Sequence, residues 1–347
     1  MEIPSVAQAL EWHAAHCERS DAPITARIIR SLVAVMHSDT ATGRRLSNWQ
    51  GQAIEDALAL RVTAGIHALH LSGEEHRLQP VFTGLLTDQG QIDAIVLKAV
   101  QRCDHAILPW FDGPPQTNEA GRSASIMGAL LWLSGRLGPR FEITEIGASA
   151  GINTMMHRYA YDLGGTKVGP DGADMLICPE WRGSAPPKAP VEITQLAGCD
   201  IAPVDLSDAE QGRRLKAYIW ADAQIRMARM DTAIAMASEQ APDLVQMDAE
   251  DFVRQRLALP QETGTTRVLF HTIMWQYLPM TTRDNIRAMM NAAGAAAGPD
   301  KPLAWVRLET NRETFRHELT VKYWPGGEEV VQLAQAHPHG AWVEWMG

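Results

Sequence analysis

The spacing of apolar residues divides the chain into two regions. Up to about residue 105, apolar side chains recur at intervals of three and four residues, which predicts amphipathic helices. The clearest helical segments are Val6–His16, Thr25–Met36 and Gln52–Leu71. From Phe141 onward, short apolar runs alternate with helical stretches. We therefore expect a helical N-terminal region over residues 1–105 and an α/β domain over residues 106–347.

The second region is expected to form a doubly wound, mostly parallel sheet with an antiparallel C-terminal edge. The predicted strands are Phe141–Ile146, Val191–Leu196, Asp243–Met247, Thr266–Met274 and Pro302–Leu308, followed by a hairpin meander of Glu318–Trp324, Glu328–Ala334 and Ala341–Trp345. Helices are predicted to start at Ile152 and to span Thr281–Ala297. The Pro- and Gly-rich stretch Gly164–Pro190 is interpreted as an insertion, near residues 160–190, after the first strand–helix unit.

Composition and charge limit the expected partners. The 347 residues include 31 Lys and Arg against 41 Asp and Glu, a formal net charge of −10. This charge disfavours nucleic acid and anionic membrane surfaces as partners. The four cysteines form no C-x-x-C pair, no apolar run approaches the ~20 residues that span a bilayer, and the N-terminus lacks signal-peptide features. We expect a cytoplasmic protein whose partner is a small molecule.

The most informative segment is Glu145-Ile-Gly147-Ala-Ser149-Ala-Gly151, between a predicted strand and a helix. Glycines at such a turn let the backbone approach a ligand and direct N–H groups at it. The spacing differs from the G-x-G-x-x-G of dinucleotide enzymes, so NAD is not favoured. It resembles the first motif of S-adenosylmethionine-dependent methyltransferases, acidic-x-G-x-G-x-G, with Ser149 in place of the middle glycine. That resemblance implies S-adenosylmethionine as cofactor, with Glu145, Gly147, Ser149 and Gly151 around it.

Two acidic residues after later strands support this interpretation. Asp200 ends the second predicted strand, where nucleoside-binding α/β sheets place the carboxylate that accepts hydrogen bonds from the ribose diol. It follows Gly151 by more than the usual ~20 residues, an excess that the Gly164–Pro190 insertion could account for. Asp248 follows the third strand, where this fold contacts adenine. Each residue could also cap a helix or lie in a solvated loop.

The same turn is also a G-x-S-x-G, the nucleophile elbow of α/β-hydrolases. Ser149, an acid such as Asp248 or Glu309, and His339 would follow the hydrolase order of serine, acid and histidine. The helical character of the upstream chain and the lack of an HGGG-like oxyanion segment count against a hydrolase.

The motifs together resemble one bacterial family, domain-of-unknown-function family 2332. The matching segments are Pro115–Glu119 with Arg122, Glu145–Asn153 with Arg158-Tyr159, Arg182-Gly183, Gly198–Asp200 with Pro203 and Asp205, Trp275–Pro279, Trp305, Glu309, Trp324–Gly327 and His337–Gly340. The resemblance implies a methyltransferase-like Rossmann fold with an added helical region, and it assigns no reaction.

A cluster of hydrogen-bonding side chains, Gln116 to Glu119, precedes a predicted helix that carries Arg122. Thr117 or Asn118 could cap that helix. Arg122 could bind a ligand carboxylate bidentately. In the methyltransferase-like fold that the resemblance implies, this segment lies over the cofactor. Arg122 is therefore a candidate cofactor contact, and Gln116, Asn118 and Glu119 are candidate substrate contacts.

The fourth predicted strand ends in His271, with Trp275 and Tyr277 after it. Open α/β sheets place their ligand crevice at such strand ends. Methyl transfer needs orientation, a base for the acceptor proton and aromatic faces beside the sulfonium cation. His271 is the candidate base because imidazole titrates near neutral pH, and Trp275 and Tyr277 are candidate substrate contacts. A buried structural histidine and core aromatic rings are the alternatives.

His337 and His339 would face the same way on a strand, which suits a metal with Glu309 as a further ligand. No other Cys or His cluster accompanies them, so we expect no bound metal. A structural turn and a substrate contact remain open, and Glu309 and His339 are candidate substrate contacts.

The leading hypothesis is methyl transfer from S-adenosylmethionine to an unknown small molecule. A non-catalytic nucleoside-binding or regulatory protein of the same fold is the alternative, because Ser149 replaces a glycine and Trp275-Gln-Tyr-Leu278 departs from the N/D-P-P-Y/F tetrad of many methyltransferases. A serine hydrolase using Ser149 is the third hypothesis.

Overall fold

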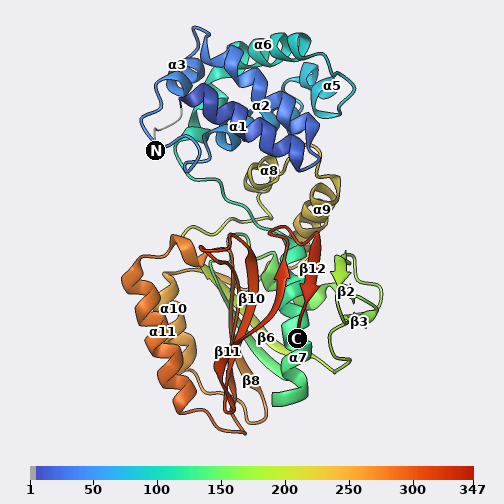
Figure 1. Cartoon of the computed structure of the whole chain (residues 1–347), viewed down its shortest axis with the longest axis vertical. Helices are drawn as coiled ribbons and strands as arrows, with labels where there is room; N and C mark the ends of the chain where they lie inside the picture. Colours follow the sequence, from blue (N-terminus) through green and yellow to red (C-terminus); the bar gives the residue numbers. More distant parts are fainter. Residues whose placement is uncertain (1–4) are drawn as a thin grey trace. The chain divides into compact units, whose positions relative to one another are not determined.

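The computed structural model describes residues 5–347 and contains two compact units. The helical unit comprises the described residues up to Thr117 together with Asp208–Ala228, and the sheet unit comprises Asn118–Ser207 with Arg229–Gly347. The chain therefore leaves the helical unit, forms part of the sheet unit, and returns before it completes the sheet (Figure 1).

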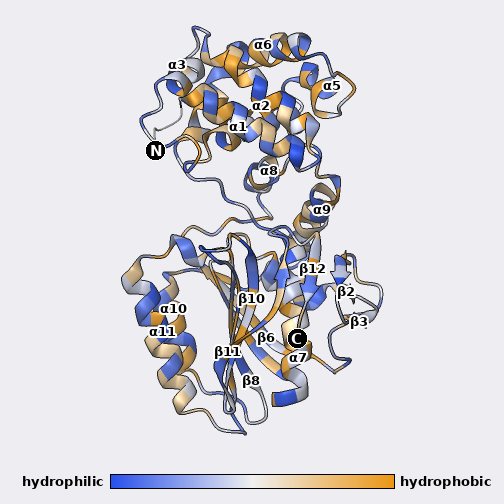
Figure 2. Cartoon of the chain, viewed as in Figure 1, coloured by the Kyte–Doolittle hydropathy of each residue, from blue (hydrophilic) through white to orange (hydrophobic). Residues whose placement is uncertain are grey.

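The helical unit is built around an aliphatic core. Its helices are α1 (Val6–Arg19), α2 (Pro23–Met36), α3 (Ala41–Ser47), α4 (Leu58–Leu71), α5 (Gln79–Phe82), α6 (Gln89–Ile107) and α8 (Ala209–Ala217). Ser5 and Gln8 form a capping box at α1, and Pro23 is the first residue of α2. Core residues such as Ile28 and Leu32 recur at helical spacing. Hydrophobic and hydrophilic residues accordingly alternate along α1, α2 and α6 in Figure 2.

Asp222 ties the returning segment to the helical unit. Its carboxylate accepts hydrogen bonds from the backbone N–H groups of Ile24 and Thr25, at 2.9 and 2.8 Å, and from the Thr25 hydroxyl at 2.7 Å. These N–H groups lie in the first turn of α2, where helix donors lack intrahelical partners. Because α2 has no side-chain cap at its own N-cap residue, Asp222 supplies one from a position 198 residues later than Ile24.

The sheet unit contains a nine-stranded sheet in the order β5-β12-β11-β10-β9-β8-β1-β6-β7. Its strands are β1 (Arg140–Ile146), β5 (Glu180–Arg182), β6 (Glu192–Asp200), β7 (Leu244–Gln246), β8 (Thr266–Thr272), β9 (Leu303–Thr310), β10 (His317–Trp324), β11 (Gly327–Ala336) and β12 (Trp342–Trp345). Neighbours from β7 to β9 are parallel, and those from β9 to β12 are antiparallel. The predicted mixed α/β class with a large, mostly parallel sheet is confirmed.

The strand order reverses between β1 and β8. From β1 the chain proceeds to β6 and β7 on one side, then crosses to β8 and β9 on the other. Helix α7 (Ser123–Leu137) lies on one face of the sheet, and α10 (Ala249–Ala258) and α11 (Met280–Ala295) cover the other (Figure 1). Open α/β sheets bind ligands outside the carboxyl ends of the strands at such a reversal. A ligand site of this kind would therefore lie at the loops after β1, β6 and β8.

The segment after β1 differs from the predicted helix. It forms the 3₁₀ helix η4 (Asn153–Arg158). The buried hydroxyls of Tyr159 and Tyr161 donate to the carbonyls of Ile152 and Met156, at 2.6 and 2.9 Å, so these carbonyls find partners outside an α-helix. The insertion then forms a small sheet of β2 (Ala160–Leu163), β3 (Thr166–Val168) and β4 (Leu176–Ile177), and its β5 pairs with β12 in the large sheet.

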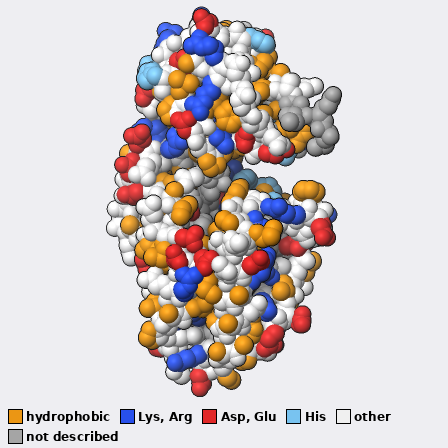
Figure 3. All heavy atoms as spheres, turned by 90° about the vertical axis from the view of Figure 1, so that its left-hand side faces the viewer, with side chains coloured by type: hydrophobic (Ala, Val, Ile, Leu, Met, Phe, Trp, Pro, Cys, Tyr) orange, Lys and Arg blue, Asp and Glu red, His pale blue; other side chains and the backbone are white. Residues whose placement is uncertain are grey.

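The surface carries charges of both signs. Figure 3 shows acidic and basic side chains interspersed with hydrophobic ones on the face toward the viewer. Within residues 5–347, no helix combines the length and hydrophobicity that a bilayer crossing needs.

Replacing Asp222 with alanine should destabilise the helical unit by about 1–3 kcal/mol, because three donors at the start of α2 lose a charged acceptor. We expect a Tm several degrees lower in thermal unfolding followed by circular dichroism. Asp39→Ala is the matched control, since Asp39 is exposed and pairs with Arg44 at the surface. Equal melting of the two variants would show that Asp222 does not hold the returning segment.

Candidate functional site

The turn between β1 and η4 has a left-handed backbone at three positions. Gly147, Ser149 and Gly151 adopt φ angles of 66°, 54° and 70°. A Cβ on Gly147 would lie 2.7 Å from the Met274 side chain, so a glycine is required where the turn meets the loop after β8. Ser149 adopts this conformation with a side chain, at a cost of about 1–2 kcal/mol. Its hydroxyl is buried and has no hydrogen-bond partner among the described residues.

Asp200, at the end of β6, holds this turn in place. Its Oδ2 accepts the backbone N–H of Ser149 at 2.8 Å, and its Oδ1 accepts that of Ala202 at 2.9 Å. The Ala148 N–H donates to the Cys199 carbonyl at 2.9 Å. A carboxylate offers about four acceptor positions, so Asp200 keeps acceptor capacity after these two bonds. The structure thus brings together two predicted segments, the glycine turn and the end of β6.

Glu145, near the end of β1, is buried beside the turn. Its side chain is 1% exposed and accepts a hydrogen bond from the Thr154 hydroxyl at 2.7 Å. Burial raises the pKa of Glu145 from its ordinary value of 4.5 to about 8, against the lowering effects of Thr154, Asn153 and Arg122. The carboxyl is therefore mostly protonated at neutral pH. Glu145 supports the turn from the protein interior and does not face solvent.

Two predicted residues ahead of β1 are also buried and bind the same region. The side-chain oxygen of Asn118 accepts the Ile152 N–H at 2.9 Å, where the turn enters η4. Arg122 donates from Nε to the Pro338 carbonyl at 2.8 Å and from Nη1 to the Thr272 carbonyl, at the end of β8, at 3.4 Å. Both side chains therefore fix protein segments at the carboxyl edge of the sheet.

His271, in β8, forms a pair with Glu309 of β9. The imidazole is fully buried, and its Nδ1 lies 2.6 Å from Oε1 of Glu309. The Trp275 ring stacks on the imidazole with 4.8 Å between centroids and 15° between planes. The same Glu309 oxygen accepts the N–H groups of Met274 and Trp275, at 3.2 and 3.3 Å. Nε2 of His271 has no partner within the described part of the chain.

The remaining predicted residues make separate contacts. Asp248 is exposed and caps α10 through its side chain, and Tyr277 is 77% exposed. Gln116 belongs to the helical unit. The His339 N–H donates to Nδ1 of His337 at 3.1 Å. Across residues 5–347, no group of three or more His, Cys, Asp and Glu side chains is arranged to hold a metal ion.

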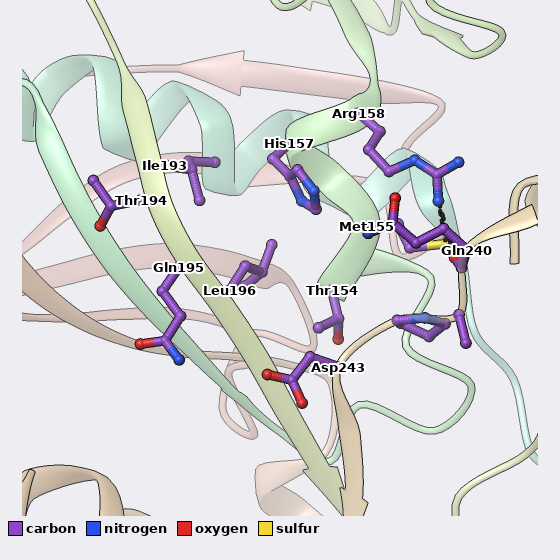
Figure 4. A pocket seen from close by; sticks show the side chains of 12 residues that line it. Thr154, Met155, His157, Arg158, Ile193, Thr194, Gln195, Leu196, Gln240 and Asp243 are labelled. Carbon is purple, nitrogen blue, oxygen red and sulfur yellow. Dashed lines mark hydrogen bonds between the residues drawn. The ribbon is translucent and has the colours of Figure 1, made fainter.

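A polar cavity of about 310 Å³ lies among η4, β6 and the segment before β7 (Figure 4). Its lining includes Thr154, Arg158 and Asp243. Arg158 donates from Nη1 to the Gln240 carbonyl at 3.1 Å, and both residues line the cavity (Figure 4). None of the site residues predicted from the sequence, all of which the structure describes, lines this cavity. Two lining residues contact the candidate site: Thr154 binds Glu145, and Pro242 lies against Gly151.

Three residues at the site carry no motif and were not predicted. Thr154 binds Glu145, and Met274 packs on the glycine turn. Arg229 belongs to α9 (Gln224–Glu239), and its Nη1 lies 3.7 Å from Oε1 of the buried Glu119. A buried acid such as Glu119 implies a cationic partner. The sequence offers 31 Lys and Arg residues, and nothing in their pattern distinguishes Arg229.

The fold defines a mixed α/β protein with a large, mostly parallel sheet and a left-handed turn where the strand order reverses. The chain belongs to the family described as "Uncharacterized protein conserved in bacteria (DUF2332)", whose model matches residues 7–345. The family resemblance carried by the motifs is thereby confirmed, and the match also covers the helical unit. No curated protein and no solved structure matches the chain.

Replacing Glu145 with glutamine should flatten the dependence of stability on pH. The folded-state pKa of about 8 exceeds the ordinary 4.5, so between these values the folded protein binds the extra proton and stability falls as pH rises. Glutamine does not titrate, so this fall, at most about 1.4 kcal/mol per pH unit, should disappear. Urea unfolding at a series of pH values measures it.

The control for this experiment is Glu313→Gln, at an exposed position between β9 and β10, which should keep the slope of the wild type. Parallel curves for wild type and Glu145→Gln would contradict a protonated Glu145 in the folded state.

Proposed function

We propose that the sheet unit binds S-adenosylmethionine where the strand order reverses and transfers its methyl group to a small molecule. The observation that carries the proposal is the left-handed turn Gly147–Gly151 hydrogen-bonded to Asp200, at the carboxyl ends of two neighbouring parallel strands. A glycine turn beside a strand-end carboxylate is the arrangement with which α/β sheets bind nucleosides.

The hydrogen bonds of the turn favour a nucleoside without a pyrophosphate. Dinucleotides are held by free backbone N–H groups at the start of an α-helix. Here the N–H groups of Ala148, Ser149 and Ile152 already donate to protein acceptors, and a six-residue 3₁₀ helix follows. A cofactor that needs a carboxylate for its ribose, and no phosphate site, therefore suits this turn better than NAD does.

Of the predicted cofactor residues, we expect some to contact the cofactor and others to hold the surrounding protein in position. Asp200 has acceptor capacity left for the ribose hydroxyls, and the exposed Asp248 is the candidate on the adenine side. Arg122 and Glu145 are buried among protein groups and act as positioning residues. When bound, the cofactor supplies an electrophilic methyl group on a sulfonium.

His271 is the proposed base for the proton of the methyl acceptor. Its Nδ1 is bound to Glu309, so Nε2 is the nitrogen that remains for this proton. Glu309 orients the ring through this contact. Because Nε2 is buried and Trp275 covers the ring, an acceptor reaches it only when the loop that carries Trp275 moves.

Titration calorimetry on the full chain tests the cofactor site. S-adenosylhomocysteine, the product form, should bind with a saturable heat, and NAD should give none. Asp200→Asn should weaken S-adenosylhomocysteine by roughly ten- to a hundredfold, because the ribose hydroxyls lose a charged acceptor. Asp205→Asn, five residues later in the loop after β6, is the matched control and should bind as the wild type does.

If the wild-type protein shows no heat with millimolar S-adenosylhomocysteine or S-adenosylmethionine, the proposal is wrong. Binding of S-adenosylhomocysteine that Asp200→Asn leaves unchanged would remove Asp200 from the ribose site. If the intact chain binds the nucleoside tightly but transfers no methyl group to the acceptors tested, the result would favour the hypothesis of a non-catalytic, regulatory protein.

A serine hydrolase is the second candidate, favoured by the left-handed φ of Ser149 in a G-x-S-x-G turn after a strand. A serine nucleophile needs a hydrogen-bonded base, and the Ser149 hydroxyl binds no histidine among the described residues. We therefore expect a fluorophosphonate probe not to label the protein, as measured by mass spectrometry of the intact chain. Stoichiometric labelling that Ser149→Ala removes would replace the methyltransferase proposal with a hydrolase.

A further inference from the structure

The helical unit contains a cavity of about 610 Å³ that the proposed cofactor site does not use. It lies among the turn between α1 and α2, the C-terminal end of α4, α5 and the returning segment after α8. Cavities that bind small molecules in proteins measure roughly 300–1,000 Å³. This cavity therefore has room for a ligand of that size within one unit of the protein.

Part of the cavity lining is apolar and aromatic. The rings of His67 and His70 stack on Phe82 with centroid distances of 4.7 and 4.9 Å and nearly parallel planes. Burial lowers the pKa of His67 to about 4 and also lowers that of His70, so both rings are uncharged at neutral pH. Ile24 and Met227 add aliphatic surface to the lining.

The lining also contains two acidic residues. Asp21 and Asp222 belong to the lining, and no Lys or Arg is among the described residues that line it. The carboxylate of Asp21 has no hydrogen-bond or ion-pair partner in the described part of the chain. Among the described donors, Oδ1 of Asp222 accepts the Ile24 N–H alone, which leaves this oxygen a further acceptor position.

We propose that this cavity binds a small organic cation with an aromatic or apolar body, such as an arylalkylamine. The uncharged rings receive the apolar body, and the two carboxylates attract the ammonium group through charge and hydrogen bonding. An anion of the same shape is excluded because it would face two carboxylates without a counter-charge. The proposal does not depend on methyl transfer, since it concerns residues of the helical unit alone.

Titration calorimetry of the full chain with tryptamine tests the proposal, and indole-3-acetate serves as the anion with the same ring. Tryptamine should bind saturably and indole-3-acetate should not. Asp21→Asn should weaken tryptamine by about three- to fivefold, the size of one partly solvated ion pair. The substitution suits the left-handed backbone of Asp21, whose φ is 56°. Asp39→Asn, at an exposed aspartate outside the lining, should bind as the wild type does.

A second variant places a positive charge at the cavity, whereas Asp21→Asn removes a negative one. Thr83 is exposed and belongs to the lining, so Thr83→Lys should abolish tryptamine binding while circular dichroism shows an unchanged fold. No binding of tryptamine to the wild type, equal binding of tryptamine and indole-3-acetate, or tryptamine binding that neither Asp21→Asn nor Thr83→Lys weakens would each overturn the proposal.

Discussion

The hydrogen bond from the Ser149 N–H to the Asp200 carboxylate is the contact on which the carboxyl edge of the sheet depends. It joins the turn after β1 to the end of β6 across 51 residues of sequence. The turn is held further by the bonds from Ala148 to Cys199 and from Val204 to the Ser149 carbonyl. These bonds to β6 and to the loop after it fix the left-handed conformation of the turn.

Carboxylates perform the same structural task elsewhere in the chain. Asp222 caps α2, Asp104 accepts the N–H groups of Ala41 and Thr42 at the start of α3, and Glu309 accepts those of Met274 and Trp275. In each pair the acid is distant in sequence from the donors. An acidic residue at a strand or helix end therefore has a structural role here even where it is also a ligand candidate.

The pair of His271 and Glu309 shows how burial changes the chemistry of a predicted site. Both nitrogens of the imidazole are inside the protein; one is bound to the carboxylate, and the other has no partner among residues 5–347. The loop that covers it contains Ile273 with a φ of 52°, an unfavourable conformation for a β-branched residue. Such a conformation persists only where the surrounding contacts hold it, and here the N–H groups of Met274 and Trp275, directly after Ile273, are bound to Glu309.

The sequence by itself determined the local features of this protein. Although the helices α6 and α9 were not predicted, periodicity predicted the strands β1 and β6 to β12 and the helices α1, α2, α4 and α11, and the glycine spacing predicted the turn after β1. Local patterns suffice for these features because backbone preference and apolar spacing act over a few residues. The tertiary structure alone decided that residues 208–228 return to the helical unit, that β5 joins the large sheet, and that His271 pairs with Glu309. Those pairings join groups far apart in the chain, and which buried donor meets which acceptor is settled by the packing of whole elements, which no local pattern records.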